Sequence, residues 1–293
     1  MINFRYHLVS IAAILLALAA GIALGSGPLD RADSSLNGDG SGSTSDVDPA
    51  LASFESAYAA RTSGPLLKDA LKNQSVVIFT VPGTSAVDVR GISADLKTAG
   101  AEVTGQVELS AKLLDPAGRG FAEGIAQQAA SDVPGVSAAG DSYGRIGAAI
   151  ARGFVAAKAV PVDQTATTIS SAFKQGSLLS LTTAPKKLAT LAIVVTGPQR
   201  SGGSDQSSVI AALAGTLGGA GKGVVVAGPS SSSTSGGAVK AVRDGSSATS
   251  VSTVDVTDSP AGRVVTVLAA AQQVKGQAGS WGTSRSTDGA LPR

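Results

Sequence analysis

The longest apolar stretch of the chain lies near its N-terminus, where no residue from Leu8 to Leu29 carries a charge. A helix over residues 8–27 rises about 30 Å, which matches the hydrocarbon core of a bilayer. The pattern therefore predicts one transmembrane helix. Arg5 and the α-amino group precede it, so residues 1–7 are expected in the cytoplasm and the remainder outside the cell membrane. A cleavable signal peptide is the alternative, but its apolar region is usually shorter, which favours a retained anchor.

Small residues recur at every fourth position of this segment, at Ala13, Ala17, Gly21 and Gly25. On a helix they form one face, along which the backbone of another helix can approach closely. The spacing predicts helix packing in the membrane, with a partner protein or with a second copy of the chain. Chance is the alternative, because any alanine-rich helix contains such spacings.

Residues 28–70 turn to glycine, serine and aspartate, a composition that buries too little apolar surface to fold alone. We expect a flexible linker that contains one short helix near residues 51–61, broken at Gly64-Pro65.

The stretch 71–278 alternates short β-branched runs with segments of helical spacing, which predicts an α/β domain with a mostly parallel sheet and flanking helices. Whether this is one continuous sheet or two βαβ lobes stays open. The expected strands are residues 75–81, 103–109, 189–196, 223–227 and 251–256. The expected helices are residues 87–99, capped by Ser85 or Asp88, then 207–217, 238–243 and 261–274.

Two parts of the chain have weaker patterns. Between residues 111 and 187, helices are expected near 121–130, 146–157 and 168–181. The polar tail, 279–293, is expected to be disordered beyond Trp281, whose ring either docks onto the domain or stays exposed.

Composition excludes several classes of chemistry. The net charge is +2 without a run of Lys or Arg, so nucleic acid is not expected as a partner. The chain has no cysteine, and His7 and Met1 are its single histidine and methionine, so the soft ligands that copper prefers are missing from the domain. A Ser-His catalytic pair is also not expected, because the single histidine, His7, precedes the predicted anchor and is far along the chain from the serine-rich loops.

Ligands of open parallel sheets bind at the carboxyl ends of the strands, in the loops after Phe79, Val195 and Val226. These loops are rich in Gly and Ser that could offer backbone N–H groups to an anion, and Arg200 could add charge. Glycines that only permit tight turns are the alternative. Asp255 and Asp258 could act as paired carboxylates, or as turn and cap residues. We expect no catalytic residue, cofactor or metal ligand, and a domain that recognises a partner without transforming it.

Several segments carry a resemblance to a known family. They are RYHLVSIAAILLALAAGIALGSGPL from Arg5, LKNQSVVIFTVPG at Leu71–Gly83, STVDVTDSPAGRVVTVLAA at Ser252–Ala270, and Gly-x-Trp-Gly at Gly279–Gly282, where relatives carry Gly-x-Tyr-Gly. The chain resembles, nearly end to end, the actinobacterial copper transporter family MctB, to which the corynebacterial cell-separation regulator SteB is related.

The resemblance implies two functions. One is copper efflux across the cell envelope, for which the mycolate outer membrane is an alternative location. The other is SteB-like regulation of cell separation, together with a SteA-like membrane partner. A single helix cannot line a pore unless it oligomerises, so the residues favour a non-enzymatic interaction module anchored in the membrane. Relatives typically carry a charged coiled coil after the membrane helix. Residues 30–64 show no sustained heptads, so a coiled-coil interface is not expected here.

Overall fold

The structure is a computed structural model that describes residues 49–199 and 204–292. The predicted membrane helix at residues 8–27, with its stripe of Ala13, Ala17, Gly21 and Gly25, lies outside the described residues. Within those two ranges, no helix combines the length and the apolar character needed to cross a bilayer.

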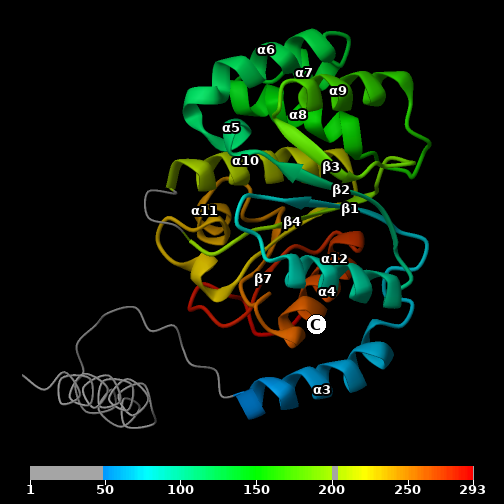
Figure 1. The fold of residues 1–293 in the computed structure, drawn as a ribbon, viewed down its shortest axis with the longest axis vertical. Coiled ribbons are helices and arrows are strands. Elements are labelled where there is room, and N and C mark those ends of the chain that lie inside the picture. Colours follow the sequence, from blue (N-terminus) through cyan, green and yellow to red (C-terminus); the bar gives the residue numbers. More distant parts are fainter. Residues whose placement is uncertain (1–48, 200–203, 293) are drawn as a thin grey trace, which may run out of the picture. The chain divides into compact units, whose positions relative to one another are not determined.

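One seven-stranded sheet forms the centre of the described chain, with strand order β3-β2-β1-β4-β5-β6-β7 (Figure 1). Neighbouring strands are parallel except for β2 and β3, which pair antiparallel. The mixed α/β class and the mostly parallel sheet are therefore confirmed, and one continuous sheet takes the place of two lobes. The strands are β1 (Ser75–Thr80), β2 (Glu102–Leu109), β3 (Leu179–Thr183), β4 (Leu191–Val195), β5 (Val224–Ala227), β6 (Ser252–Val254) and β7 (Ser280–Trp281).

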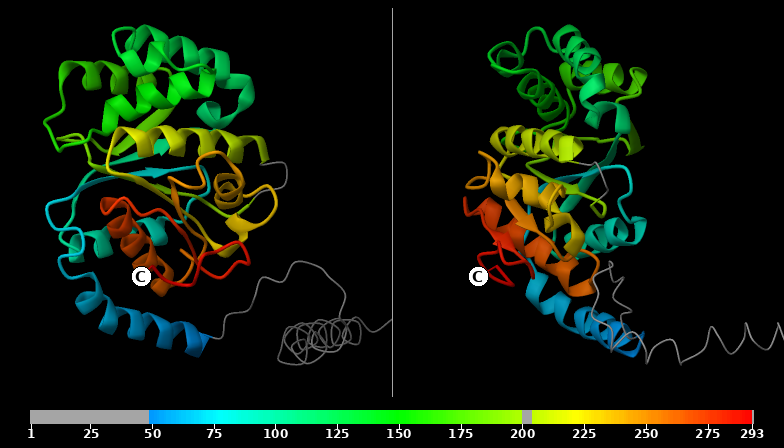
Figure 2. Two further views of the ribbon diagram at one scale, coloured as in Figure 1. Left: turned by 180° about the vertical axis from the view of Figure 1, so that it is seen from behind. Right: turned by 90° about the vertical axis from the view of Figure 1, so that its left-hand side faces the viewer.

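Helices cover both faces of the sheet (Figure 2). One face packs against α4 (Ala86–Thr98) and α12 (Pro260–Val274), and α3 (Pro49–Leu67) lies against α12. The other face carries α5 (Ala111–Leu114), α6 (Arg119–Ala129), α7 (Pro134–Ser137), α8 (Ser142–Phe154), α9 (Gln164–Gln175), α10 (Ser204–Ala220) and α11 (Ala238–Asp244). The 3-10 turns η1 (Pro116–Gly118) and η2 (Ser230–Ser233) complete the connections.

The continuous apolar run of β1 results from burial on both sides. Val77 and Phe79 belong to the core under α8 and α10, whereas Val76 and Ile78 belong to the core under α4 and α12. A strand in a parallel sheet covered by helices on both faces needs apolar residues at every position. The same reasoning holds for β4 and β5, all of whose residues are buried.

The predicted helix cap at the start of α4 is confirmed at Ser85, whose hydroxyl accepts a hydrogen bond from the Asp88 backbone N–H at 3.3 Å. The five expected strands and the helices at 87–99, 207–217, 238–243 and 261–274 all appear, with small shifts at their ends. Strong periodicity therefore located these elements correctly.

Two boundaries predicted from sequence are wrong. The helix expected to break at Gly64-Pro65 continues to Leu67 with Pro65 inside it, although a proline cannot donate to the carbonyl oxygen four residues earlier. The helix expected over residues 168–181 ends at Gln175. Ser177 then adopts a φ of 57°, and β3 begins at Leu179 to pair with β2. Pairing with a distant strand is not visible in the local pattern.

Candidate functional site

The reversal of strand order between β1 and β4 is where open sheets usually bind ligands. Here the two loops at this point contact each other. The Thr84 hydroxyl lies 2.8 Å from the carbonyl oxygen of Val81 and 2.9 Å from that of Val195, and donates to them. A Cβ at Gly197 would lie 2.5 Å from the Gly83 carbonyl oxygen, so the close approach requires glycine. The crevice is largely filled by the protein itself.

The remaining cavity beside these loops has a volume of about 40 Å³. Pockets for small molecules usually measure about 300–1,000 Å³, so the cavity that the described residues line here is too small for a nucleotide or sugar. Gly83 and Gly236 have φ values of 89° and 81°, which supports the interpretation that the loop glycines permit tight turns. Arg200, proposed from sequence to add charge here, lies outside the described residues.

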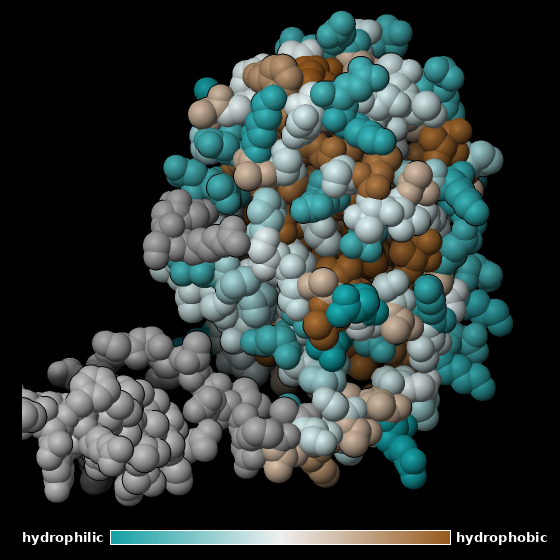
Figure 3. Space-filling model, viewed as in Figure 1, coloured by the Kyte–Doolittle hydropathy of each residue, from teal (hydrophilic) through white to brown (hydrophobic). Residues whose placement is uncertain are grey.

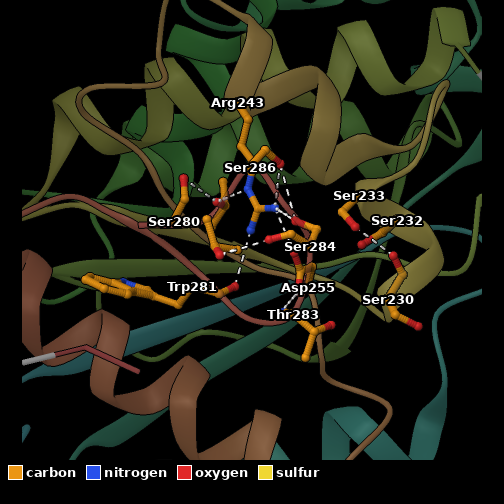
Figure 4. Close-up of polar contacts among 12 residues, drawn as sticks. Ser230, Ser232, Ser233, Arg243, Asp255, Ser280, Trp281, Thr283, Ser284 and Ser286 are labelled. Carbon is orange, nitrogen blue, oxygen red and sulfur yellow. Dashed lines mark hydrogen bonds and ion pairs between the residues drawn. The ribbon is translucent and has the colours of Figure 1, made fainter. Parts of the chain in front are cut away.

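The most elaborate polar site joins α11, β6 and the C-terminal tail around a buried ion pair (Figure 4). Arg243 Nη1 lies 2.7 Å from Asp255 Oδ2, and the two side chains are only 4% and 0% exposed. The Arg243 Nε donates to the Thr253 hydroxyl at 2.8 Å, and its Nη2 donates to the Trp281 carbonyl oxygen at 3.2 Å. Arg243 was not predicted from the sequence, although an Arg in the last turn of a helix, before a strand that leads into an aspartate, was a usable signal.

The C-terminal tail is held by this ion pair. Thr283 N–H donates to Asp255 Oδ1 at 2.8 Å, and the Ser284 hydroxyl accepts from Arg243 at 2.6 Å. The expectation of disorder beyond Trp281 is therefore wrong for residues 282–292, because buried charges supply partners for their polar groups. The Trp281 ring packs against the core beneath α4 and α12, which decides between docking and exposure.

The two aspartates considered as paired carboxylates lie in different environments. Asp255 is occupied by Arg243, whereas Asp258 accepts hydrogen bonds from the Ser230 backbone N–H and hydroxyl at 3.4 and 3.1 Å. Ser259, rather than either aspartate, caps α12. Both carboxylates stabilise the chain's own loops, which agrees with the structural alternative.

Asp255 links the stability of the tail to pH. Burial alone raises the pKa of its carboxyl, but hydrogen bonds from Ser284, Arg243 and the Thr283 amide more than offset this and hold the pKa below its ordinary value. A carboxyl whose pKa is lower in the folded state contributes stability above its unfolded pKa. That contribution is lost as the pH falls from about 4 through the folded pKa.

We expect Ser284→Ala to lower the free energy of unfolding by about 2 kcal/mol at pH 7, because it removes the hydrogen bond to the charged Asp255 and the one that the hydroxyl accepts from Arg243. The difference from wild type should shrink below about pH 4, as Asp255 becomes protonated in both proteins. Urea unfolding of the full-length chain at several pH values, followed by the fluorescence of Trp281, measures this. Ser286→Ala is the control, since Ser286 contacts Arg243 at 3.2 Å and is not among the groups that lower the Asp255 pKa. An equal pH dependence in both variants would contradict the role of Ser284 in stabilising the charged form of Asp255.

A second group of charges lies between α4 and α12, where Arg263 Nη1 is 3.2 Å from Asp88 Oδ1. Burial raises the pKa of Asp88 and of Asp95, and the positive charge of Arg263 opposes the rise in both cases. Gly91 leaves room for the arginine, since a Cβ there would lie 2.4 Å from Arg263 Nε. The group joins two helices across one face of the sheet and is structural.

One face of α3 exposes a cluster of large apolar and aromatic side chains. Leu51, Phe54 and Tyr58 are 51%, 64% and 61% exposed, and the rings of Phe54 and Tyr58 stack with centroids 6.2 Å apart. Their spacing of three and four residues places them on one side of the helix. On another side, Ala59 and Leu67 are buried in the domain. In Figure 3, α3 lies along the lower edge of the domain, where its surface is a mixture of white, tan and teal. The sequence predicts a helix here, but the apolar face formed by this spacing was not predicted.

Metal-ligating side chains do not converge in the part of the chain that the structure describes. No group of three or more His, Cys, Asp or Glu side chains there could hold an ion. The single His and Met of the sequence, His7 and Met1, lie outside the described residues. The described domain thus offers copper no imidazole, thiolate or thioether.

Comparison with known proteins gives one consistent result. The family described as "Copper transport outer membrane protein, MctB" matches residues 1–292. Copper transporter MctB of Mycobacterium tuberculosis strain H37Rv is 30% identical over 312 aligned positions, which cover 97% of this chain and 96% of that protein. Copper transporter MctB of Mycobacterium leprae is 30% identical over 304 positions, covering 92% of each. The chain belongs to the MctB family.

Proposed function

We propose that this protein is a membrane-anchored component of copper export in the cell envelope, whose α/β domain acts by binding another protein through α3. Copper is the cargo of the resulting complex and is not held by the side chains of the domain. The observation that carries the proposal is the exposed apolar face of Leu51, Phe54 and Tyr58 on α3.

The family name and the ligand chemistry together favour a complex in which a partner protein binds copper and this domain binds the partner. The relatives are named copper transporters, which supports copper as the transported ion. Proteins that bind copper directly use soft or borderline ligands such as Cys, Met and His, and residues 49–293 contain none of them. A domain without such ligands contributes to transport most simply by positioning or regulating a partner that has them.

The α3 face has the character of a protein interface. Aromatic residues are enriched at interface centres, where few side chains supply most of the binding free energy. Phe54 and Tyr58 are pre-stacked on a helix, so little side-chain entropy is lost when a partner covers them. The rest of α3 is fixed to α12, which gives the exposed side a rigid support.

The position of α3 in the chain favours a partner at the membrane. Only residues 28–48 separate it in the sequence from the predicted anchor, and the flexible linker that their composition predicts would span roughly 25 Å. A membrane protein is therefore within reach of α3, with a second copy of the chain as the other occupant. We place the protein in the cell membrane as a single-pass protein with a cytoplasmic N-terminus, and keep the mycolate outer membrane as the alternative.

A growth assay tests the proposal. Cells that lack the gene should become copper-sensitive, and the wild-type chain should restore growth. We expect Phe54→Ser with Tyr58→Ser to fail to restore it at equal protein level, because polar side chains remove the apolar contact. Val87→Ser with Leu291→Ser is the matched control, since these residues are 59% and 61% exposed and lie outside α3. Full copper resistance with the α3 variant would refute the role of this face.

Regulation of cell separation is the second candidate, favoured by the absence of copper ligands from the domain. It uses the same α3 face with a SteA-like membrane partner, and it involves no enzymatic step. The deletion strain separates the two candidates. Chained, unseparated cells with normal copper resistance would support the second candidate and overturn the first.

A further inference from the structure

Lysines gather at the amino ends of the parallel strands. Six segments lead into β1, β2, β4, β5, β6 and β7, namely residues 68–74, 97–101, 184–190, 221–223, 245–251 and 275–279. Together they contain seven lysines and a single acidic residue, Asp69. Since the six strands are parallel to one another, their amino ends lie along one edge of the sheet. This edge is on the right in Figure 1, where α3 ends and β1 begins.

Contacts between these segments hold the lysines on one surface. Gln74, just before β1, accepts a hydrogen bond from Lys222 Nζ at 3.0 Å, and its backbone carbonyl accepts from the Glu102 N–H at 2.9 Å. Lys72 lies against the turn that ends α4, since a Cβ at Gly100 would lie 3.4 Å from the Lys72 Cα. The end of α12 lies beside the start of β5 in the same way. The same side of the domain is lined with teal, hydrophilic residues in Figure 3.

Acidic groups offset little of this charge. Asp69 lies 3.9 Å from Lys72 Nζ, and Glu102 is paired with Lys187 at 2.5 Å. The other six lysines are exposed and form what we call the lysine edge: Lys68, Lys72, Lys97, Lys186, Lys222 and Lys275. Apart from Lys72, none of them has an acidic partner among the residues that the structure describes. Six lysines against Asp69 leave an excess of five positive charges, although the whole chain has a net charge of only +2.

The chemistry of the lysine edge suits an extended anionic surface. All of its basic residues are lysines, whose ammonium is a compact and strongly hydrated charge on a flexible stem. Sites that recognise one carboxylate or phosphate group typically use the planar fork of arginine instead. The edge is also wide, because neighbouring strands of a sheet are about 4.8 Å apart and the lysines precede several of them. Its partner therefore has many anionic groups spread over a surface.

The length of the chain before the domain favours a lipid surface. Helix α3 has 19 residues and therefore measures about 28 Å. It ends at Leu67, directly before Lys68, so its first residue is one helix length from the lysine edge. The flexible linker predicted over residues 28–48 would span roughly 25 Å. It is long enough to lead from the predicted anchor to the start of α3 while the end of α3 returns to the membrane surface.

We propose that the lysine edge docks on the anionic lipid headgroups of the membrane that holds the predicted anchor. The parallel strands then point away from the bilayer. Helix α3 stands beside the bilayer, and its apolar face remains open to a partner in the same membrane. The inference rests on the membrane anchoring in the proposed function, but it does not depend on copper or on the contact made by α3.

Fluorescence quenching of the full-length chain in vesicles tests the docking. The sequence has no cysteine, so a fluorophore can be attached at Thr98→Cys, at the lysine edge, or at Ala86→Cys, at the other end of α4. The two exposed positions are about 18 Å apart along the helix. The vesicles contain equal parts of phosphatidylglycerol and phosphatidylcholine, or phosphatidylcholine alone, with a nitroxide on some headgroups as the quencher.

We expect the label at position 98 to be quenched in the anionic vesicles and only weakly in the neutral ones. Salt at 1 M shortens the Debye length to about 3 Å and should reverse the quenching. The label at position 86 should be quenched equally little in both kinds of vesicle, because it lies at the opposite end of α4.

Two triple variants separate the lysine edge from net charge. The edge variant combines Lys72→Gln, Lys97→Gln and Lys275→Gln. It should lower the ratio of docked to undocked protein about 100-fold, since each lysine near an anionic surface contributes about 1 kcal/mol, or roughly fivefold. The matched control on α5, α9 and α11 combines Lys112→Gln, Lys174→Gln and Lys240→Gln. It removes the same charge and should change the ratio less than about twofold.

Equal quenching at position 98 in the two kinds of vesicle would overturn the proposal, as would an equal loss in the two triple variants. If the label is not quenched in anionic vesicles, retention on heparin that the edge variant loses would assign the edge to an anionic polymer and refute docking on lipid. Flotation with phosphatidylcholine vesicles measures the anchor separately. Its failure would count against the proposed function, whereas flotation with anionic vesicles alone, lost in the edge variant, would still support the lysine edge.

Discussion

Asp255→Asn is expected to lower the free energy of unfolding by about 3–5 kcal/mol, because it leaves Arg243 charged, buried and without its counter-ion. The amide keeps the shape of the carboxylate, so the loss reports the charge and not the packing. The Thr283 amide and the Ser284 hydroxyl lose a strong acceptor in the same step, and the tail should separate from β6. Urea unfolding at pH 7 with Trp281 fluorescence measures both effects.

Asp258→Asn is the matched control. Asp258 accepts hydrogen bonds from Ser230 at the surface and also repels the carboxylate of Asp88, so the same substitution there should cost less than about 1 kcal/mol. A loss of less than about 1 kcal/mol in Asp255→Asn as well would show that Arg243 is solvated in the folded protein, and would contradict the buried ion pair.

Phe79→Ala should lower the free energy of unfolding by about 3–5 kcal/mol. Phe79 is fully buried on β1, and its ring meets that of Phe154 on α8 edge-on, with centroids 5.7 Å apart. The substitution therefore opens a cavity between the sheet and the helices on that face. Thermal unfolding monitored by circular dichroism gives the loss.

Phe54→Ala provides the comparison, because it makes the same change on the exposed side of α3 and should alter stability by less than about 0.5 kcal/mol. Equal losses in the two variants would mean that Phe54 belongs to the core. The expected contrast also separates stability from function, since Phe54 is proposed to act through a partner.

The regular part of the fold could be predicted from sequence because its elements have strong patterns. The run Ser75–Val81 and the periodic helix after Ser85 are fixed by local signals, namely β-branched residues, a turn and a cap. Leu179–Thr183 has no such signal. It becomes a strand because β2 offers an unpaired edge about 70 residues earlier in the chain, and this long-range contact overrides the helical spacing before it.

The tail shows the same limit. A polar, glycine-rich sequence after Trp281 is typical of disorder, and its order depends on Arg243 and Asp255, which come from other elements.

The role of the glycines in the loops after β1 and β4 was also ambiguous from the sequence. Gly83 and Gly197 could serve an anion or a close contact between loops, and only their positions in space distinguish the two. The α3 face, in contrast, was readable from the spacing of Leu51, Phe54 and Tyr58.

Site-specific photo-crosslinking in native membranes tests most directly whether α3 binds a protein. With benzoylphenylalanine in place of Phe54, ultraviolet light should join the chain to one defined protein, and adding Tyr58→Ser should reduce that product. The same group in place of Val87 on α4 is the control and should give no such product. A product with the mass of two copies would identify self-association through α3. Crosslinks to lipid alone at position 54, with copper resistance intact, would contradict the proposed interface.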